Sequence, residues 1–243
     1  MGRKSMGYLI LARHGEPGLE PEDRLAGWVD IPLSRKGIEE ALECAAKLEN
    51  IDLDLAFASN LVRTQETLFI ILSGQKKTGV LIHEKANDKC EIEKIEWYSF
   101  PDKLGKDLIP VYFAAALNER HYGKLQGKKK QKMIEKYGEE NVSSWRWNFE
   151  PGPPEGESLK NVYERAVPYF KQEILPAVKE GKNVLVCAHQ SSLRALVKYI
   201  EDISDEGIRE VRFSIGELIV YSFSEGRLVR EAAGINPEIK EKL

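Results

Sequence analysis

The sequence predicts an α/β fold, a three-layer α/β/α sandwich around a mostly parallel central sheet. Three short runs are continuously apolar, as in strands that are buried on both faces: residues 8–12, 53–58 and 183–188. A segment whose apolar residues recur at helical spacing follows each of them. Buried strands that alternate with helices indicate a parallel sheet with helices on both sides.

Local signals place the first elements. Ser34 precedes a predicted helix, whose apolar side is formed by Ile38, Leu42, Ala45 and Leu48. Ser59 follows the second strand and is an N-cap candidate for a helix that carries Thr64 and Leu68.

The middle of the chain is less regular. Residues 75–106 combine a short predicted strand at Val80–His83 with a charged stretch that contains Gly and Pro, which indicates an insertion or a lid. A polar, lysine-rich helix is predicted over 128–137, and the Pro and Gly residues of 150–156 predict a loop.

The last third returns to the alternating pattern. Ser158 opens a long predicted helix that ends near Lys179, and another helix is expected over 191–201. Two closing strands are predicted at 218–223 and 228–230. The length of 243 residues suits one domain, 1–243, with the insertion inside it.

Composition excludes several classes of function. The net charge of -3 provides no global basic field for nucleic acid, and no apolar run reaches membrane-spanning length. The N-terminus has no signal-peptide pattern, so we expect a cytoplasmic protein. The cysteines are odd in number and far apart, which predicts core packing for Cys44 and Cys187 and no metal site.

Charged side chains gather where the apolar strands end. Arg13 and His14 follow the first strand, His189 follows the third, and Arg63 lies in the first turn of the helix after the second. Because the carboxyl ends of parallel strands share one edge of a sheet, these four groups can converge on one crevice. Any one of them alone is equally well explained as an ordinary surface residue.

A cluster of this kind favours phosphate chemistry. Arginine offers a planar fork that matches phosphate oxygens, and a neutral histidine is a nucleophile near pH 7. Nearby arginines keep His14 neutral and stabilise the charge on a transferring phosphoryl group. Transfer to an alcohol also needs a general acid and base; Glu119 is the best candidate and Glu16 is its rival.

Five motifs then carry a family resemblance. LARHGE, GWVDIPLSRKG, ALNERHYGKLQG, PPEGESL and VLVCAHQSSLRALVKY occur in order over most of residues 8–223. Together they resemble the cofactor-dependent phosphoglycerate mutases of the histidine phosphatase superfamily. The resemblance implies a phosphoglycerate mutase-like fold, 2,3-bisphosphoglycerate as the phosphoryl primer and no metal. It implies that His14 is phosphorylated, that Arg13, Arg63 and His189 hold the phosphoryl group, and that Glu119 is the acid and base.

The resemblance also implies a substrate-binding set, which comprises Gly27, Arg120, Tyr122, Lys130, Arg146 and, after the second histidine, Gln190. From its pattern alone, Lys130 would be a residue of a solvated helix face or of a weak nucleic-acid patch. The partner is then a small phosphorylated metabolite, with no nucleic acid and no membrane, and a homodimer is possible.

Three positions depart from the mutase pattern: Glu20, Trp147 and Gln190. These residues provide fewer contacts to the far end of a bisphosphate, so more than one function remains open. The leading hypothesis is a mutase that interconverts 2- and 3-phosphoglycerate in glycolysis or gluconeogenesis. The alternative is a histidine phosphatase that transfers the phosphoryl group of a small phosphomonoester to water. A non-catalytic module that binds a phosphorylated ligand is disfavoured, because both His14 and Glu119 are present.

Overall fold

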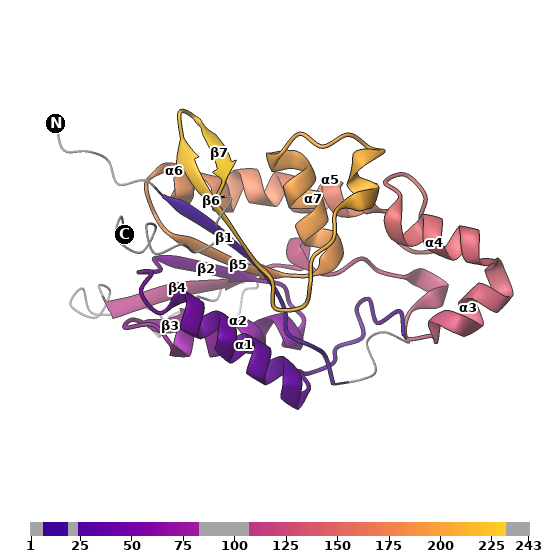
Figure 1. The fold of residues 1–243 in the computed structure, drawn as a ribbon, viewed down its shortest axis with the longest axis horizontal. Coiled ribbons are helices and arrows are strands. Elements are labelled where there is room, and N and C mark those ends of the chain that lie inside the picture. Colours follow the sequence, from indigo (N-terminus) through magenta and orange to yellow (C-terminus); the bar gives the residue numbers. More distant parts are fainter. Residues whose placement is uncertain (1–6, 19–23, 83–106, 232–243) are drawn as a thin grey trace, which may run out of the picture.

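The computed structural model describes residues 7–18, 24–82 and 107–231, and its strands form one sheet in the order β3-β4-β2-β5-β1-β6-β7 (Figure 1). Every pairing from β3 to β1 is parallel, whereas β6 and β7 pair antiparallel. The strands are β1 (Tyr8–Arg13), β2 (Leu55–Ala58), β3 (Thr78–Leu81), β4 (Leu108–Phe113), β5 (Val184–Ala188), β6 (Leu218–Ser224) and β7 (Arg227–Arg230). The predicted α/β class with a mostly parallel sheet is confirmed.

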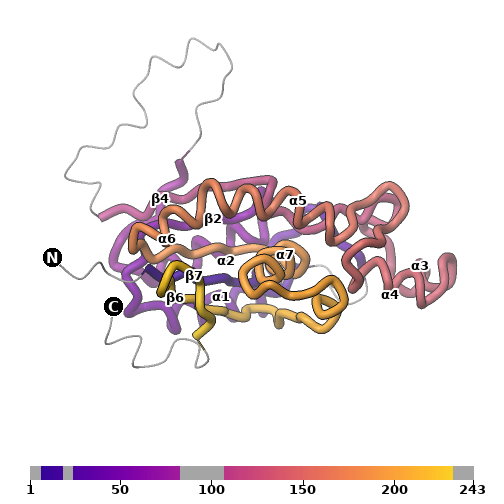
Figure 2. Tube along the Cα trace, turned by 90° about the horizontal axis from the view of Figure 1, so that it is seen from above, coloured from indigo at the N-terminus to yellow at the C-terminus, as the bar shows by residue number. Residues whose placement is uncertain are grey.

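Helices cover both faces of this sheet (Figures 1 and 2). One face carries α1 (Arg35–Leu48) and α2 (Val62–Ser73), and the other carries α5 (Leu159–Tyr169), α6 (Leu175–Lys179) and α7 (Gln190–Ile200). In β1, Leu9 and Leu11 enter the core on the α5 side, while Ile10 and Ala12 enter the core on the α1 side. This explains why the strands are continuously apolar.

A third group of helices, α3 (Lys130–Tyr137) and α4 (Glu139–Trp147), projects beyond the end of the sheet (Figure 2). The predicted helix over 128–137 is therefore confirmed but begins at Lys130. Helix α4 was not predicted; Gly138, with a φ of 83°, separates it from α3.

Helix α1 begins as predicted, because the side chain of Ser34 accepts a hydrogen bond from the backbone of Gly37. Its predicted apolar side is partly wrong, since Leu42 is 51% exposed. The buried side is formed instead by Gly37, Ala41, Cys44, Ala45 and Leu48. Small residues are needed there because a Cβ atom on Gly37 would stand 2.1 Å from the carbonyl oxygen of Glu16.

Ser59 does not cap α2, which corrects the prediction. The helix begins at Val62, whose backbone N–H donates to the carboxylate of Asp30 at 2.7 Å, so a residue distant in sequence supplies the cap. The hydroxyl of Ser59 instead lies 2.7 Å from Thr64 Oγ1 and 2.7 Å from His189 Nε2.

Strand β4 was missed because Pro110 interrupts its apolar run, although Pro110 aligns with Val80 of β3 in a parallel pair. The strand predicted at Val80–His83 lies two residues earlier, at β3. Most of the predicted insertion or lid, residues 83–106, falls outside the described residues. The single-domain prediction remains a prediction.

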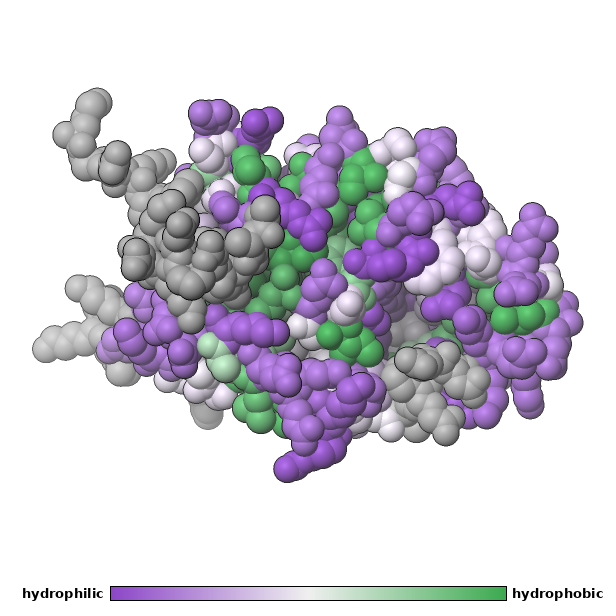
Figure 3. All heavy atoms as spheres, in the orientation of Figure 1, coloured by the Kyte–Doolittle hydropathy of each residue, from purple (hydrophilic) through white to green (hydrophobic). Residues whose placement is uncertain are grey.

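The remaining predictions of local structure hold. The long helix after Ser158 runs through α5, a π-helical segment (Phe170–Ile174) and α6. Cys44 and Cys187 are fully buried, and burial raises the pKa of both thiols. Hydrophilic side chains cover most of the face seen in Figure 3. No helix in the described parts of the chain is long and apolar enough to cross a membrane.

Candidate active site

Two histidines lie side by side because of the register between β1 and β5. Arg13 aligns with Ala188, so the next residues of both strands, His14 and His189, emerge at the same height. Their ring centroids are 4.9 Å apart. The two histidines are 175 positions apart in the sequence, and the parallel pairing of β1 with β5 brings them together. Their positions after two apolar strands predict this proximity.

His14 is held as a neutral imidazole. Its side chain is buried, and Nδ1 lies 2.7 Å from the carbonyl oxygen of Gly15, to which it donates its hydrogen. This bond leaves the lone pair on Nε2. Burial lowers the pKa of His14 well below its ordinary value, and the charges of Arg63 and Arg13 lower it further. An imidazole in this state can attack an electrophile near neutral pH.

His189 is fully buried beside it. Its Nε2 atom lies 2.7 Å from the Ser59 hydroxyl, which fixes the ring, and its Nδ1 atom has no hydrogen-bond partner among the described residues. Burial lowers the pKa of His189 well below its ordinary value, with the charges of Arg63 and Arg13 acting in the same direction. His189 is fully covered and, unlike His14, does not line the cavity at the strand ends.

Two arginines flank the histidines. Arg63 donates to the carbonyl oxygens of Val29 and Gly27, at 3.0 and 2.8 Å, which fixes its guanidinium at the start of α2. Arg13 donates to the carbonyl of Phe213, and its Nε atom is buried without a hydrogen-bond partner among the described residues. Burial lowers the pKa of both guanidinium groups. The charge of Glu119 opposes this effect at both residues, and arginine keeps its proton in proteins.

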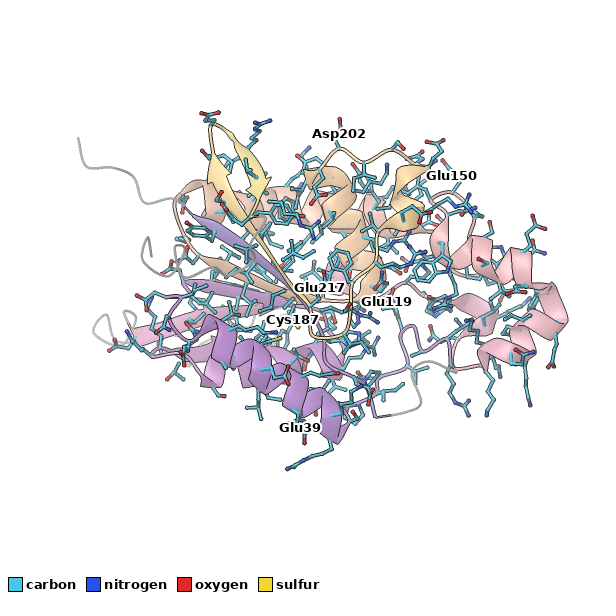
Figure 4. All side chains as sticks on the ribbon, in the orientation of Figure 1. Glu39, Glu119, Glu150, Cys187, Asp202 and Glu217 are labelled. Carbon is cyan, nitrogen blue, oxygen red and sulfur yellow. The ribbon has the colours of Figure 1, made fainter. Side chains whose placement is uncertain are left out.

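Glu119 approaches from the loop after β4 and lies where the strand ends face α3 and α4 (Figure 4). It is 9% exposed, and its carboxylate accepts from the backbone N–H groups of Arg120 and Ser191, at 2.7 and 3.4 Å. Its rival Glu16 turns away, because its carboxylate accepts from Ser34 Oγ and Lys36 Nζ beside α1. Glu119, unlike Glu16, lines the cavity at the strand ends.

That cavity has a volume of about 270 Å³, which suits a small metabolite. Five arginines and a single acidic residue line it within the described residues, namely Arg13, Arg24, Arg63, Arg146, Arg212 and Glu119. His14, Gly27, Tyr122 and Gln190 also line it. An interior with this excess of guanidinium groups attracts an anion that carries several charges.

Two members of the predicted binding set do not line the cavity. Arg120 is fully buried beneath it, with Nε 3.3 Å from Ser191 Oγ, a bond to the Trp145 carbonyl and Nη2 without a partner among the described residues. Lys130 begins α3 and is absent from the cavity wall. Glu20 lies outside the described residues, whereas Trp147 and Gln190 both line the cavity.

Sequence reasoning missed Arg24 and Arg212. Arg24 precedes the AGW segment, and Arg212 lies after the helical turn Gly207–Glu210, far from every strand end used in the prediction. A signal for Arg24 was available, since it lies three residues before Gly27. No local signal marks Arg212. Among the residues described, no group of three or more His, Cys, Asp or Glu side chains could hold a metal ion.

Comparison with known proteins gives a consistent result. The family model of the histidine phosphatase superfamily (branch 1) matches residues 9–89 and 100–235. The chain is 73% identical over 237 residues to a 2,3-bisphosphoglycerate-dependent phosphoglycerate mutase of Methanosarcina mazei, with 98% of each chain covered. It is 56% identical to the protein of the same name in Methanosarcina acetivorans, covering 98% of this chain and all of that one.

Solved structures show the same fold at low identity. The alpha-ribazole phosphatase of Shigella flexneri matches with a TM-score of 0.69 and 22% identity, covering 92% of this chain and 94% of that one. A mycobacterial glucosyl-3-phosphoglycerate phosphatase matches with a TM-score of 0.71 and 18% identity, covering 93% and 97%. At this identity the likeness concerns the fold.

Proposed function

Because the chain belongs to the histidine phosphatase superfamily, we propose that it is a phosphoglycerate mutase, which interconverts 2- and 3-phosphoglycerate through a phosphorylated histidine. The observation that carries the proposal is the pairing of a neutral, buried His14 with Glu119 in one arginine-lined cavity. A nucleophile, a general acid and the cations for a phosphoryl group are thereby present in one place.

2,3-Bisphosphoglycerate primes the enzyme in this proposal, since both Methanosarcina relatives are named as dependent on that compound. Nε2 of His14 forms a bond to phosphorus as the bond from phosphorus to the ester oxygen breaks. Glu119 in its protonated form delivers a proton to that leaving oxygen. Arg13, Arg63 and His189 contact the phosphoryl oxygens and stabilise the negative charge on them.

The second transfer reverses these roles. Monophosphoglycerate enters, the Glu119 carboxylate takes the proton from its free hydroxyl, and the hydroxyl oxygen attacks the phosphorus. The N–P bond breaks and returns His14 to its neutral form. The bisphosphoglycerate so formed gives back its other phosphoryl group by the first step, which completes the isomerisation.

The phosphatase alternative uses the same first step, with water as the acceptor in the second. The identity of 73% to the mutase of Methanosarcina mazei favours the mutase. The decisive experiment is phosphorus NMR of the purified protein with 3-phosphoglycerate, a trace of 2,3-bisphosphoglycerate and a chelator. We expect 2-phosphoglycerate to accumulate to an equilibrium mixture with little inorganic phosphate.

The same experiment separates the alternatives. Steady release of inorganic phosphate without isomerisation would overturn the mutase in favour of the phosphatase. Absence of both reactions would overturn phosphoryl transfer on phosphoglycerate altogether. The chelator is included because we propose that the reaction needs no metal. Activity that depends on an added divalent ion would overturn that part of the proposal.

The setting of the reaction is also part of the proposal. Glycolysis runs in the cytoplasm, and we place the enzyme there with a small phosphorylated metabolite as its partner. We also propose a homodimer that covers a groove beside α2, whose lining includes Ile38, Val62, Phe69 and Ile70, because Phe69 is 38% exposed there. Light scattering of the purified protein tests the oligomeric state.

A further inference from the structure

One wall of the cavity is built around an indole ring. Arg212 lies over the ring of Trp147, with 3.5 Å from its guanidinium carbon to the ring centroid, and Arg146 lies 4.9 Å from the same centroid. All three residues line the cavity. A guanidinium stacked on an aromatic face keeps its N–H groups at its edge available for hydrogen bonds.

A buried arginine anchors this wall. Arg194 is fully buried and donates to the carbonyl oxygens of Arg146, Trp147 and Ile208, at 3.1, 2.7 and 2.7 Å. It thus ties the end of α4 to the segment that leads to Arg212. Arg212 itself donates to the carbonyl of Val211 at 3.0 Å. Arg146 lies on one of the two backbone segments that Arg194 joins, and Arg212 follows the other. The bonds therefore hold both arginines in one wall of the cavity.

The wall carries more positive than negative charge. Burial lowers the pKa of Arg194 to about 9, and the charges of Arg120 and Arg212 act in the same direction. Glu210 is the acidic group that acts on Arg212, but neither Arg146 nor Arg212 forms an ion pair within the described residues. Glu119 likewise acts on Arg194, but the cations outnumber these carboxylates, and an excess of positive charge favours an anionic ligand.

This positive group is distinct from the one around His14. The charges that act on His14 are those of Arg63 and Arg13, whereas Arg146 acts on Arg212. The two groups are nevertheless adjacent, because Arg13 donates to the carbonyl of Phe213, the residue after Arg212. One small molecule with two anionic ends can therefore contact both groups within a cavity of about 270 Å³.

We propose that Arg212, stacked on Trp147, binds the carboxylate of phosphoglycerate together with Arg146 and so selects a substrate with a second anion. This inference rests on the proposed function. A guanidinium edge matches a carboxylate in two parallel hydrogen bonds, and the group around His14 already accounts for the phosphoryl end. Arg212 is exposed, so its substitution removes a charge at the rim of the cavity without emptying the core.

The test compares two ligands that differ at the carboxylate. In glycerol 3-phosphate a hydroxymethyl group replaces the carboxylate of 3-phosphoglycerate. Their dissociation constants are measured by calorimetry in His14→Ala, which cannot accept the phosphoryl group, and again after adding Arg212→Ala. We expect Arg212→Ala to raise the dissociation constant of 3-phosphoglycerate by about tenfold or more. The dissociation constant of glycerol 3-phosphate should rise much less.

The matched control is Arg209→Ala, which removes an equal charge from an exposed side chain that does not line the cavity. We expect it to leave the ratio of the two constants unchanged, and Arg212→Lys to retain part of that ratio. An equal loss for both ligands in Arg212→Ala, or no loss for either, would overturn the carboxylate assignment. A wild-type protein without mutase activity in the NMR experiment would instead overturn the proposed function.

Discussion

The guanidinium of Arg165 donates a hydrogen bond of 3.0 Å to the backbone carbonyl of Glu119, the proposed acid and base. It also donates to the carbonyls of Asn118 and Ala116, at 3.0 and 2.8 Å, and to both oxygens of Glu157. Glu157 in turn accepts from the backbone of His121 at 2.8 Å. A residue of α5 thus holds the loop that carries Glu119, without reaching the cavity itself.

We therefore predict that Arg165 is a positioning residue. Arg165→Ala should lower kcat by about tenfold to a hundredfold, because a misplaced general acid loses its alignment, while KM changes less. Arg165→Lys should restore part of kcat, since an ammonium reaches some of the same carbonyls. Steady-state kinetics measure both. The control is Lys160→Ala, on the same helix, because the Lys160 side chain is only partly buried and pairs with Glu150. A loss confined to KM in Arg165→Ala would contradict the assignment.

Glu119→Gln should slow turnover by about 10²–10⁴-fold, because the amide keeps the shape of the side chain but cannot carry the proton. Binding of 3-phosphoglycerate should remain close to that of the wild type. Glu16→Gln tests the rival on the same scale and should retain nearly full activity. A fully active Glu119→Gln would move the acid role to another residue.

His14→Ala should abolish turnover and all covalent phosphate. After exposure to radiolabelled 2,3-bisphosphoglycerate, the wild-type protein should carry a label that is lost in acid and kept in alkali, as expected for an N–P bond. The label is measured after rapid quenching. Residual labelling of the variant would mean that another side chain is the nucleophile.

Features that follow from the order of the strands could be predicted from the sequence. His14 and His189 were predicted to meet because both follow buried strands, and the alignment of Arg13 with Ala188 places them 4.9 Å apart. A parallel sheet converts that pattern into proximity. The fold class follows from the same apolar strands.

Features set by tertiary packing were not predictable. The carboxylate of Asp30 caps α2, whereas the hydroxyl of Ser59 contacts His189. Rules that consider only neighbours in the sequence therefore assign the cap to the wrong residue. Arg212 reaches the cavity because Arg194 donates both to Ile208, in the segment that leads to Arg212, and to Arg146 and Trp147 of α4. The residues of α4 lie 47 and 48 positions from Arg194 in the sequence. Lys130 was expected in the site from resemblance, yet it is absent from the wall of the cavity.

The two buried histidines make stability depend on pH. Their pKa values are lowered in the folded protein, so below the ordinary value of about 6.5 the unfolded chain binds protons that the folded chain does not. Stability is therefore fully present above that pH and falls as the pH decreases through it. The loss reaches about 1.4 kcal/mol per pH unit for each histidine, as long as the folded protein leaves it neutral.

Urea unfolding between pH 5 and pH 8 measures this dependence. His14→Gln removes one of the two groups, and we expect it to decrease the slope below pH 6 by about 1.4 kcal/mol per pH unit. Carboxylates that titrate in the same range affect both proteins equally, so the difference isolates His14. Equal slopes would show that His14 is protonated in the folded state.

Anions that fill the cavity should stabilise the protein more than neutral molecules of similar size. Arg13 Nε and Gln190 Nε2 belong to residues that line the cavity and are buried without partners among the described residues, and a polyanion can accept from such donors. At a concentration of 100 times its Kd, 2,3-bisphosphoglycerate should add about 2.7 kcal/mol, which raises Tm by about 5–10 °C for a chain of this length. Scanning calorimetry at constant ionic strength, with glycerol as the neutral comparison, measures the shift. Because salt screens long-range attraction, a shift that sodium chloride reproduces would reflect the overall field of the arginines, whereas a shift specific to the phosphoester reflects contact with these donors.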